Sequence, residues 1–136
     1  MFKIDLYKKN LEDLLKKGFN FRYFNQVNNG EDIFLRHDID FSLENALSIA
    51  ELENKLDIKS VYFFMLSSNT YNLLSEFNKS LVFKIKDLGH MISIHFDPIV
   101  YTNINKSFIK EKNTFDSFFS TNIDFVSIHR PGIFLK

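Results

Sequence analysis

The chain lacks cysteine and tryptophan, and its 136 residues include only two prolines and four glycines. Without cysteine it can form neither a disulfide framework nor a thiolate metal site, which fits a reducing compartment. A charge excess of either sign is missing too, because lysine plus arginine and aspartate plus glutamate number 17 each. There is thus no basic excess of the kind that binds nucleic acid or anionic membranes.

Long apolar runs are also absent. No stretch approaches the ~20 residues of a transmembrane helix, and the first ten residues, MFKIDLYKKN, contain no apolar core like that of a signal peptide. We therefore expect a soluble, cytoplasmic chain whose partners include neither a membrane nor nucleic acid. The hydrophobic content of 45% is that of a folded protein, and the length allows one domain with a real core.

The apolar residues follow two periods in alternation. A helical period predicts helices over residues 6–19, 42–57, 75–89 and 105–120, whereas dense or alternating apolar runs predict strands over 33–40, 60–67, 90–97 and 124–132. Ser42 is placed to cap the second helix. The helices are expected to bury apolar stripes that include Phe77, Leu81, Ile85 and Leu88 in the third and Phe108, Phe115, Phe118 and Phe119 in the fourth. Strand and helix thus alternate four times, which favours an α/β fold with parallel strands, as an open sheet or part of a barrel.

Polar side chains gather where three of these strands end. Side chains alternate between the two faces of a strand, so Asp38 and Asp40 share one face, and His95 and Asp97 share the corresponding face of a later strand. His129 ends the last strand in the same way. Because ligands of α/β folds bind at the carboxyl ends of parallel strands, we expect these side chains to converge. Neutral imidazoles and carboxylates suit a divalent metal such as zinc.

Other polar residues near this edge are expected to support the site or the core. Arg36 shares the face of Asp38 and lies one step deeper, where it can form a buried ion pair with that carboxylate. Alternation places His37 on the helix-facing side, as a hydrogen-bonded structural residue beside the site. His90 begins its strand at the opposite end and is also predicted to be structural. Asp97 is expected next to the metal ligands.

Four segments in order, LRHDIDFSLENAL, KSVYFFM, LGHMISIHFD and SIHRPG, resemble a branch of the polysaccharide deacetylase family, which are metal-dependent carbohydrate esterases. The resemblance extends from about Asp32 to Gly132. It implies a distorted (β/α) barrel of about seven or eight strands. Since four strands cannot close such a barrel, we expect residues 1–136 to form a single truncated domain, a partial barrel incomplete at its C-terminus, with residues 1–30 as a helical lead-in.

The resemblance also implies a set of metal ligands. It assigns Asp40 and His95 to the metal. The second metal histidine of the family would fall at Ile99, which cannot bind a metal. Either Asp97 or His129 must replace it, or the site is defective, and we favour His129 because it lies on the polar face.

Catalytic roles follow from the same resemblance. Of the aspartate pair, Asp38 would be the general base and Asp40 the metal ligand, or the reverse. Arg130 and Pro131 match the Arg-Pro turn of the family, whose arginine orients the base.

The function implied is removal of N- or O-acetyl groups from a sugar or glycan precursor in surface polysaccharide metabolism, with zinc as the expected metal. The later family motifs, including a general-acid histidine, have no counterpart here, so it is open whether the chain is an enzyme. The alternative is an inactive remnant, or a metal- or carbohydrate-binding module that needs a partner chain to complete the barrel. The pair His37–Asp38 also suggests a His-Asp phosphohydrolase, but in those enzymes the pair lies in a helical bundle and here it ends a strand.

Overall fold

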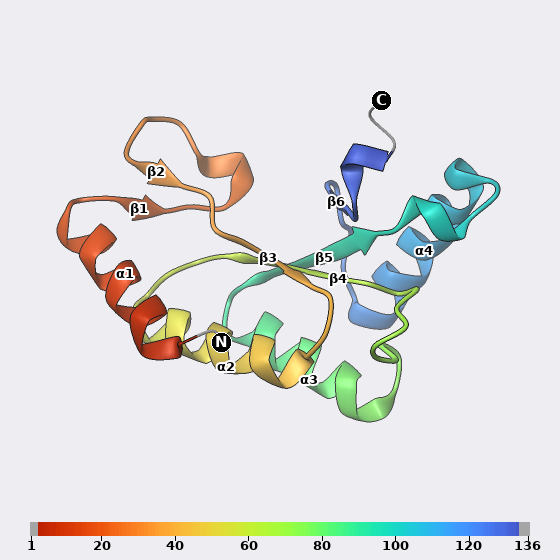
Figure 1. The fold of residues 1–136 in the computed structure, drawn as a ribbon, viewed down its shortest axis with the longest axis horizontal. Helices are drawn as coiled ribbons and strands as arrows, with labels where there is room; N and C mark the ends of the chain where they lie inside the picture. The colour runs from red at the N-terminus through yellow and green to blue at the C-terminus, as the bar shows by residue number, and fades with distance from the viewer. Residues whose placement is uncertain (1–2, 134–136) are drawn as a thin grey trace.

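The computed structural model describes residues 3–133 (Figure 1). No helix in this range is long and apolar enough to cross a bilayer. In chain order the elements are α1 (Ile4–Lys16), β1 (Asn20–Phe21), η1 (Phe24–Gln26), β2 (Asp32–Ile33), β3 (Arg36–Ile39), α2 (Leu43–Lys55), β4 (Val61–Phe64), α3 (Glu76–Asp87), β5 (Met91–Phe96), η2 (Pro98–Val100), α4 (Ile104–Phe119), β6 (Ser127–Ile128) and η3 (Pro131–Ile133).

The main sheet has four strands in the order β3-β4-β5-β6, and every neighbouring pair is parallel. The sheet is curled like half of a barrel, with α2 and α3 side by side on its outer side and α4 beside β5 and β6 (Figure 1). Each strand reaches the next through a helix, as parallel pairing requires. This curled sheet confirms the predicted α/β fold with about four parallel strands and helical crossovers.

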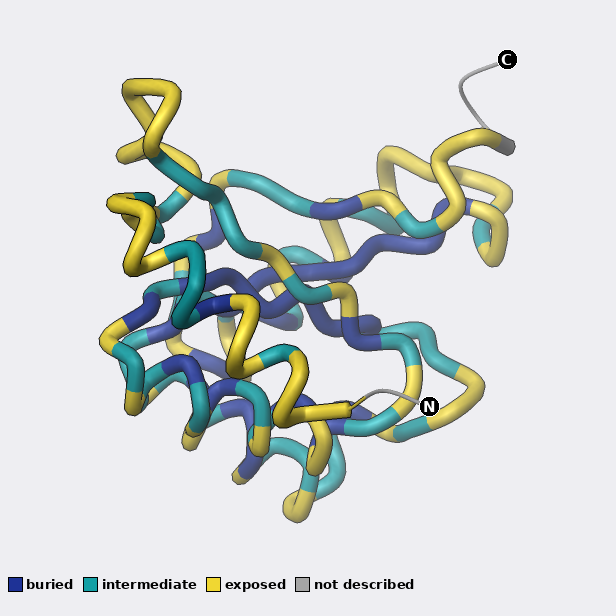
Figure 2. The backbone as a smooth tube through the Cα atoms, turned by 60° about the vertical axis from the view of Figure 1, so that its left-hand side comes forward, coloured by how far each residue is buried: buried dark blue, intermediate teal, exposed yellow. Residues whose placement is uncertain are grey.

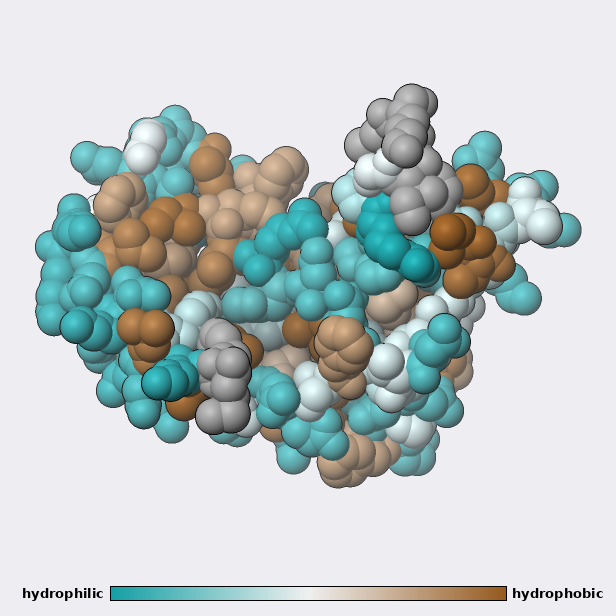
Figure 3. Space-filling model, in the orientation of Figure 1, coloured by the Kyte–Doolittle hydropathy of each residue, from teal (hydrophilic) through white to brown (hydrophobic). Residues whose placement is uncertain are grey.

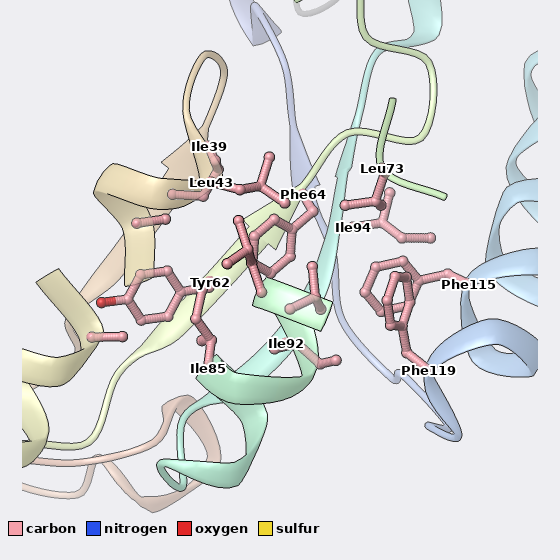
Figure 4. Packing of buried hydrophobic residues seen from close by; sticks show 14 of the residues in the cluster. Ile39, Leu43, Tyr62, Phe64, Leu73, Ile85, Ile92, Ile94, Phe115 and Phe119 are labelled. Carbon is pink, nitrogen blue, oxygen red and sulfur yellow. The ribbon is translucent and has the colours of Figure 1, made fainter. Parts of the chain in front are cut away.

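The core fills the space between the sheet and its helices. Figure 4 shows Tyr62 and Phe64 of β4 in one cluster with Ile85 of α3, and Phe115 and Phe119 of α4 packed together near β5. All five side chains are fully buried. In Figure 2 the buried parts of the backbone follow the strands and the inner sides of the helices, while the exposed parts are mostly loops and outer helix turns.

Helix ends follow the expected local chemistry. Ser42 caps α2, because its Oγ accepts a hydrogen bond from the backbone N–H of Asn45 at 3.2 Å. Gly89 follows α3 with a φ of +87°, a left-handed conformation that glycine adopts without steric cost. These signals set the helix boundaries close to the predicted ones.

Some predicted elements differ from the structure. The single strand predicted over residues 33–40 is divided into β2, which pairs with β1 in a separate parallel two-stranded sheet, and β3. The last strand is shorter than predicted and comprises only β6. Two predicted core residues, Phe77 and Phe118, are 60% and 44% exposed. Val82, which is fully buried, takes the place of Phe77 on the inner side of α3.

Candidate metal centre

Three polar side chains meet at the carboxyl ends of β3, β5 and β6. Asp40 directly follows β3, His95 is the second-last residue of β5, and His129 directly follows β6. The ladder between β5 and β6 brings the histidines together, because the backbone N–H of His129 donates to the carbonyl of Phe96 at 2.8 Å. The structure thus joins the three residues that the sequence predicted as metal ligands.

The spacing of their ligand atoms suits a divalent cation. His95 Nε2 and His129 Nδ1 are 2.9 Å apart, and Asp40 Oδ1 lies 3.5 Å from the former and 3.6 Å from the latter. Ligand atoms bound tetrahedrally to zinc at ~2.0–2.1 Å would be about 3.3 Å apart. Asp40 Oδ1 is buried and has no hydrogen-bond partner among the described residues. A buried carboxylate oxygen without a donor fits a site that binds a cation.

The charge state of His95 also suits metal binding. Its burial lowers the pKa of the imidazole below the ordinary value, even though the carboxylates of Asp38 and Asp40 act in the opposite direction. A neutral ring offers a lone pair to a metal. His95 Nδ1 lies 3.0 Å from the hydroxyl of Ser127, so Nδ1–H can donate to Ser127 and leave Nε2 free as a ligand. Ser127 is buried on β6, and the sequence reasoning did not single it out.

Asp38 lies beside this cluster and pairs with an arginine. Arg36 Nη2 donates to Asp38 Oδ2 at 2.6 Å and to the Ser127 hydroxyl at 2.9 Å, and the guanidinium lies over the ring of Phe63. Asp38 Oδ1 is 4.0 Å from His95 Nδ1. The predicted Arg36–Asp38 pair is therefore present, but the two side chains are 49% and 27% exposed rather than buried.

Arg130 differs from its predicted role. It was expected to orient Asp38, yet its Nη2 donates to Asp97 Oδ2 at 2.6 Å. Asp97 is 5% exposed and is engaged in this ion pair rather than in the cluster of ligand atoms. The arginine beside Asp38 is Arg36, which lies two residues before it on the same face of β3.

His37 lies on the opposite face of β3, as predicted from strand alternation. Its Nε2 is 2.6 Å from Oε1 of Glu53, a fully buried carboxylate of α2. Tyr7, Ser60 and Tyr62 also donate to that carboxylate. Although burial raises the pKa of Glu53, its hydrogen bonds and the charge of His37 lower it overall. This network joins α1, α2, β3 and β4 behind the candidate metal centre.

His90 is structural, as predicted. Its Nε2 donates to the carbonyl of Ala50 at 3.0 Å, and burial lowers the pKa of its ring. It lies just before β5, at the end of the sheet away from Asp40 and His129.

A cavity of about 240 Å³ opens beside the metal ligands. Its wall includes Asp40, His129 and the polar loop Ser67–Thr70 that follows β4. Ser67 and Tyr101 each donate to the buried Glu111 of α4, Ser67 at 2.8 Å. Between the β1–β2 region and the segment after β6, the surface is mostly hydrophilic (Figure 3). The cavity can therefore take a polar ligand next to a metal.

A larger cavity of about 320 Å³ lies elsewhere, at the opposite end of β5, between Lys86 and the loop 120–125. Size alone would favour it as a site. However, the one cluster of His, Asp or Glu side chains with metal-binding geometry among residues 3–133 is Asp40, His95 and His129. The metal-binding cluster therefore makes the smaller cavity the better candidate for a functional site.

The chain was compared with protein-family models, with curated proteins and with solved structures, and none of them matches. What the chain does must therefore be inferred from its own residues.

Proposed function

We propose that this chain is a metal-dependent hydrolase domain of the polysaccharide deacetylase type, which removes an acetyl group from a sugar or glycan precursor. The observation that supports this proposal is the meeting of Asp40, His95 and His129 at one edge of a parallel sheet, with all ligand atoms within 4.8 Å of one another. Zinc is the proposed metal because a carboxylate and two imidazoles form one of its common catalytic ligand sets. The cytoplasm stays the predicted location.

The cation would be held by Asp40 Oδ1, His95 Nε2 and His129 Nδ1. When bound, a divalent cation in such a site polarises a carbonyl and lowers the pKa of water near it. The cavity beside the ligands has room for a small acetylated group, and the hydroxyls of the 67–70 loop line its polar wall.

Asp38 is the proposed general base, which would accept a proton from water near the ligands. Its Oδ1 lies 4.0 Å from the ring of His95, and its Oδ2 accepts from Arg36. The contact with Arg36 orients the carboxylate, so Arg36 would carry the role that the family resemblance implied for Arg130.

A second candidate is a metal- or carbohydrate-binding module without activity of its own. The curled sheet favours it, because four strands enclose half of a (β/α) barrel and leave β3 and β6 as edges of the main sheet. In that case a partner chain would pair with one of these edges and supply the remaining catalytic groups.

Titration of the purified protein with Zn²⁺ by calorimetry, followed by an assay of acetate release, tests the proposal. Wild type is expected to bind one Zn²⁺ per chain, and Asp40→Ala and His95→Ala are expected to lose this binding. The zinc-loaded wild type should release acetate from N-acetylglucosamine oligomers or from O-acetylated xylan fragments. Asp38→Asn should keep the zinc and lose at least ~100-fold in rate, as expected when a general base is removed.

Each other result has a definite meaning. Zinc binding without acetate release from any acetylated sugar would favour the binding module. If wild type binds no Zn²⁺ or Co²⁺, the proposed function is wrong.

A further inference from the structure

Arg130 has an unusual backbone conformation directly after the candidate ligand His129. Its φ is +51°, in the left-handed region that side chains other than glycine rarely adopt. It also precedes Pro131, and a residue before proline prefers an extended backbone. The conformation is therefore strained, and such strain persists only where the surroundings hold it in place.

The Arg130 side chain is held by a buried carboxylate from the neighbouring strand. Asp97, which is 5% exposed, accepts from Arg130 Nη2 at 2.6 Å through Oδ2 and from the backbone N–H of Ile99 through Oδ1. The second bond caps η2 and fixes the carboxylate independently of the arginine. Asp97 is thus a rigid anchor for a side chain that is itself 47% exposed.

The pair connects the two strand ends that carry the histidines. Asp97 lies two residues after His95, and Arg130 lies one residue after His129. The ladder between these ends is short, since β6 has only two residues. Beyond it lies the left-handed turn at Arg130. Next to this turn the His129 ring is perpendicular to the His95 ring, with centroids 4.9 Å apart.

We infer that Asp97 and Arg130 form a positioning clamp: their ion pair stabilises the left-handed turn at Arg130 and so keeps His129 Nδ1 in ligating position. Neither residue is one of the three candidate ligands, and both line the cavity beside them. The inference rests on the proposed metal centre and assigns two residues that act on it through His129.

The chain allows a test that separates loss of charge from loss of backbone conformation. Arg130→Ala removes the ion pair and leaves a residue that is strained at positive φ. Arg130→Gly removes the same ion pair, but glycine adopts positive φ freely. Arg130→Lys keeps a positive charge, and Asp97→Asn keeps the η2 cap while removing the negative charge. Arg22→Ala is the matched control, because Arg22 pairs with Asp32 near the separate β1–β2 sheet.

Zn²⁺ affinity by calorimetry, the visible absorption spectrum of the Co²⁺ form, and urea unfolding of the metal-free protein are measured for each variant. Zinc affinity is expected to fall about 100-fold in Arg130→Ala but only about 20-fold in Arg130→Gly. The zinc affinity of Asp97→Asn should fall at least ~10-fold. That of Arg130→Lys should stay within about fivefold of wild type, and that of Arg22→Ala should be unchanged. The Co²⁺ spectrum of Arg130→Ala should lose the intensity typical of a tetrahedral site.

Three results would overturn the clamp. The first is wild-type affinity and an unchanged Co²⁺ spectrum in Arg130→Ala. The second is an equal loss in Arg130→Ala and Arg130→Gly, which would mean that the backbone conformation has no part in it. The third is a loss of zinc affinity that is fully explained by the lower stability of the metal-free variant. In all three cases the proposed metal centre stands, whereas failure of wild type to bind Zn²⁺ or Co²⁺ overturns both.

Discussion

The hydroxyl of Ser127 lies 3.0 Å from His95 Nδ1, on the side of the imidazole ring away from Asp40. Arg36 donates to the same hydroxyl at 2.9 Å. With the arginine as one donor, the Ser127 oxygen can accept Nδ1–H from His95 as well. The contact then fixes both the tautomer and the orientation of the ring, which is the usual way that proteins tune a metal-binding histidine.

Removing that hydroxyl is expected to weaken metal binding without removing a ligand. We predict that Ser127→Ala lowers Zn²⁺ affinity by about 10- to 100-fold, because His95 is then free to rotate or to adopt the other tautomer. Calorimetric titration at neutral pH measures the change. Ser93→Ala is the matched control, since Ser93 is also buried but donates to the carbonyl of Phe125 instead. An equal loss of affinity in both variants would contradict the role given to Ser127.

The carboxylate of Glu53 should be important for stability rather than for metal binding. It is fully buried and accepts from Tyr7, Ser60 and Tyr62, with His37 at 2.6 Å. Glu53→Gln turns part of this acceptor into a donor that faces other donors. We therefore expect a loss of about 3 kcal/mol in the free energy of unfolding.

Urea unfolding of the metal-free protein measures this loss. Glu51→Gln, an exposed residue of the same helix, should change stability by less than about 0.5 kcal/mol. Zinc affinity should stay within about threefold of wild type in both, since Glu53 lies behind the opposite face of β3. A large change in zinc affinity with little change in stability would contradict the structural role.

His90 should make the metal-free protein less stable in mild acid. Burial holds the pKa of its ring below the value of about 6.5 that it has in the unfolded chain. As pH falls through that value, the unfolded chain takes up the proton first, so the free energy of unfolding decreases, by at most ~1.4 kcal/mol per pH unit for one group. Its neighbours include Ser60, Glu53 and Lys59.

Replacing the ring tests this pH dependence. His90→Gln should have a shallower slope of unfolding free energy between pH 7 and pH 5 than wild type, measured by urea unfolding at several pH values. Some slope should remain, because burial lowers the pKa of His95 as well. If the slope is the same with and without His90, its ring does not titrate differently in the folded and unfolded states.

Two phenylalanines of α4 are expected to differ in their effect on stability. Phe115 is fully buried in the core, whereas Phe118 is 44% exposed. Phe115→Ala should cost about 3–5 kcal/mol through the cavity that it leaves, and Phe118→Ala less than about 1 kcal/mol. Thermal and urea unfolding of both variants measures the difference. Similar losses would mean that the position of α4 against the sheet is wrong.

Strand alternation and helix periodicity were sufficient to predict much of this molecule. The period of two in β3 correctly separated Asp38 from His37. The strand-end rule correctly predicted that Asp40, His95 and His129 meet, but it also included Asp97, which pairs with Arg130 instead. Both rules depend on local backbone geometry, which a sequence pattern reports directly. The pairing of β1 with β2 was missed because two-residue strands leave almost no periodic signal.

The partners of charged side chains were harder to predict. Arg130 was expected on Asp38 because of the family resemblance, but the left-handed turn after His129 directs it to Asp97. Glu53 was not predicted to be buried, yet it continues the buried stripe of Leu43, Ala46 and Ala50 along α2. The helical spacing of these residues could therefore have predicted that Glu53 is buried. The contact of Ser127 with His95 depends on the register of β6 against β5, which no local pattern encodes.

The three candidate ligands come from strands that are far apart in the sequence, and β6 is the shortest strand of the sheet that carries them. A metal bound to all three would cross-link β6 to β3 across the whole width of the sheet. Such a cross-link shifts the local opening of β6 toward the closed state in proportion to the metal concentration. Amide hydrogens of the β6 ladder, including that of His129, should then exchange with solvent more slowly once metal is bound, so the edge of the sheet itself would report whether the site is filled.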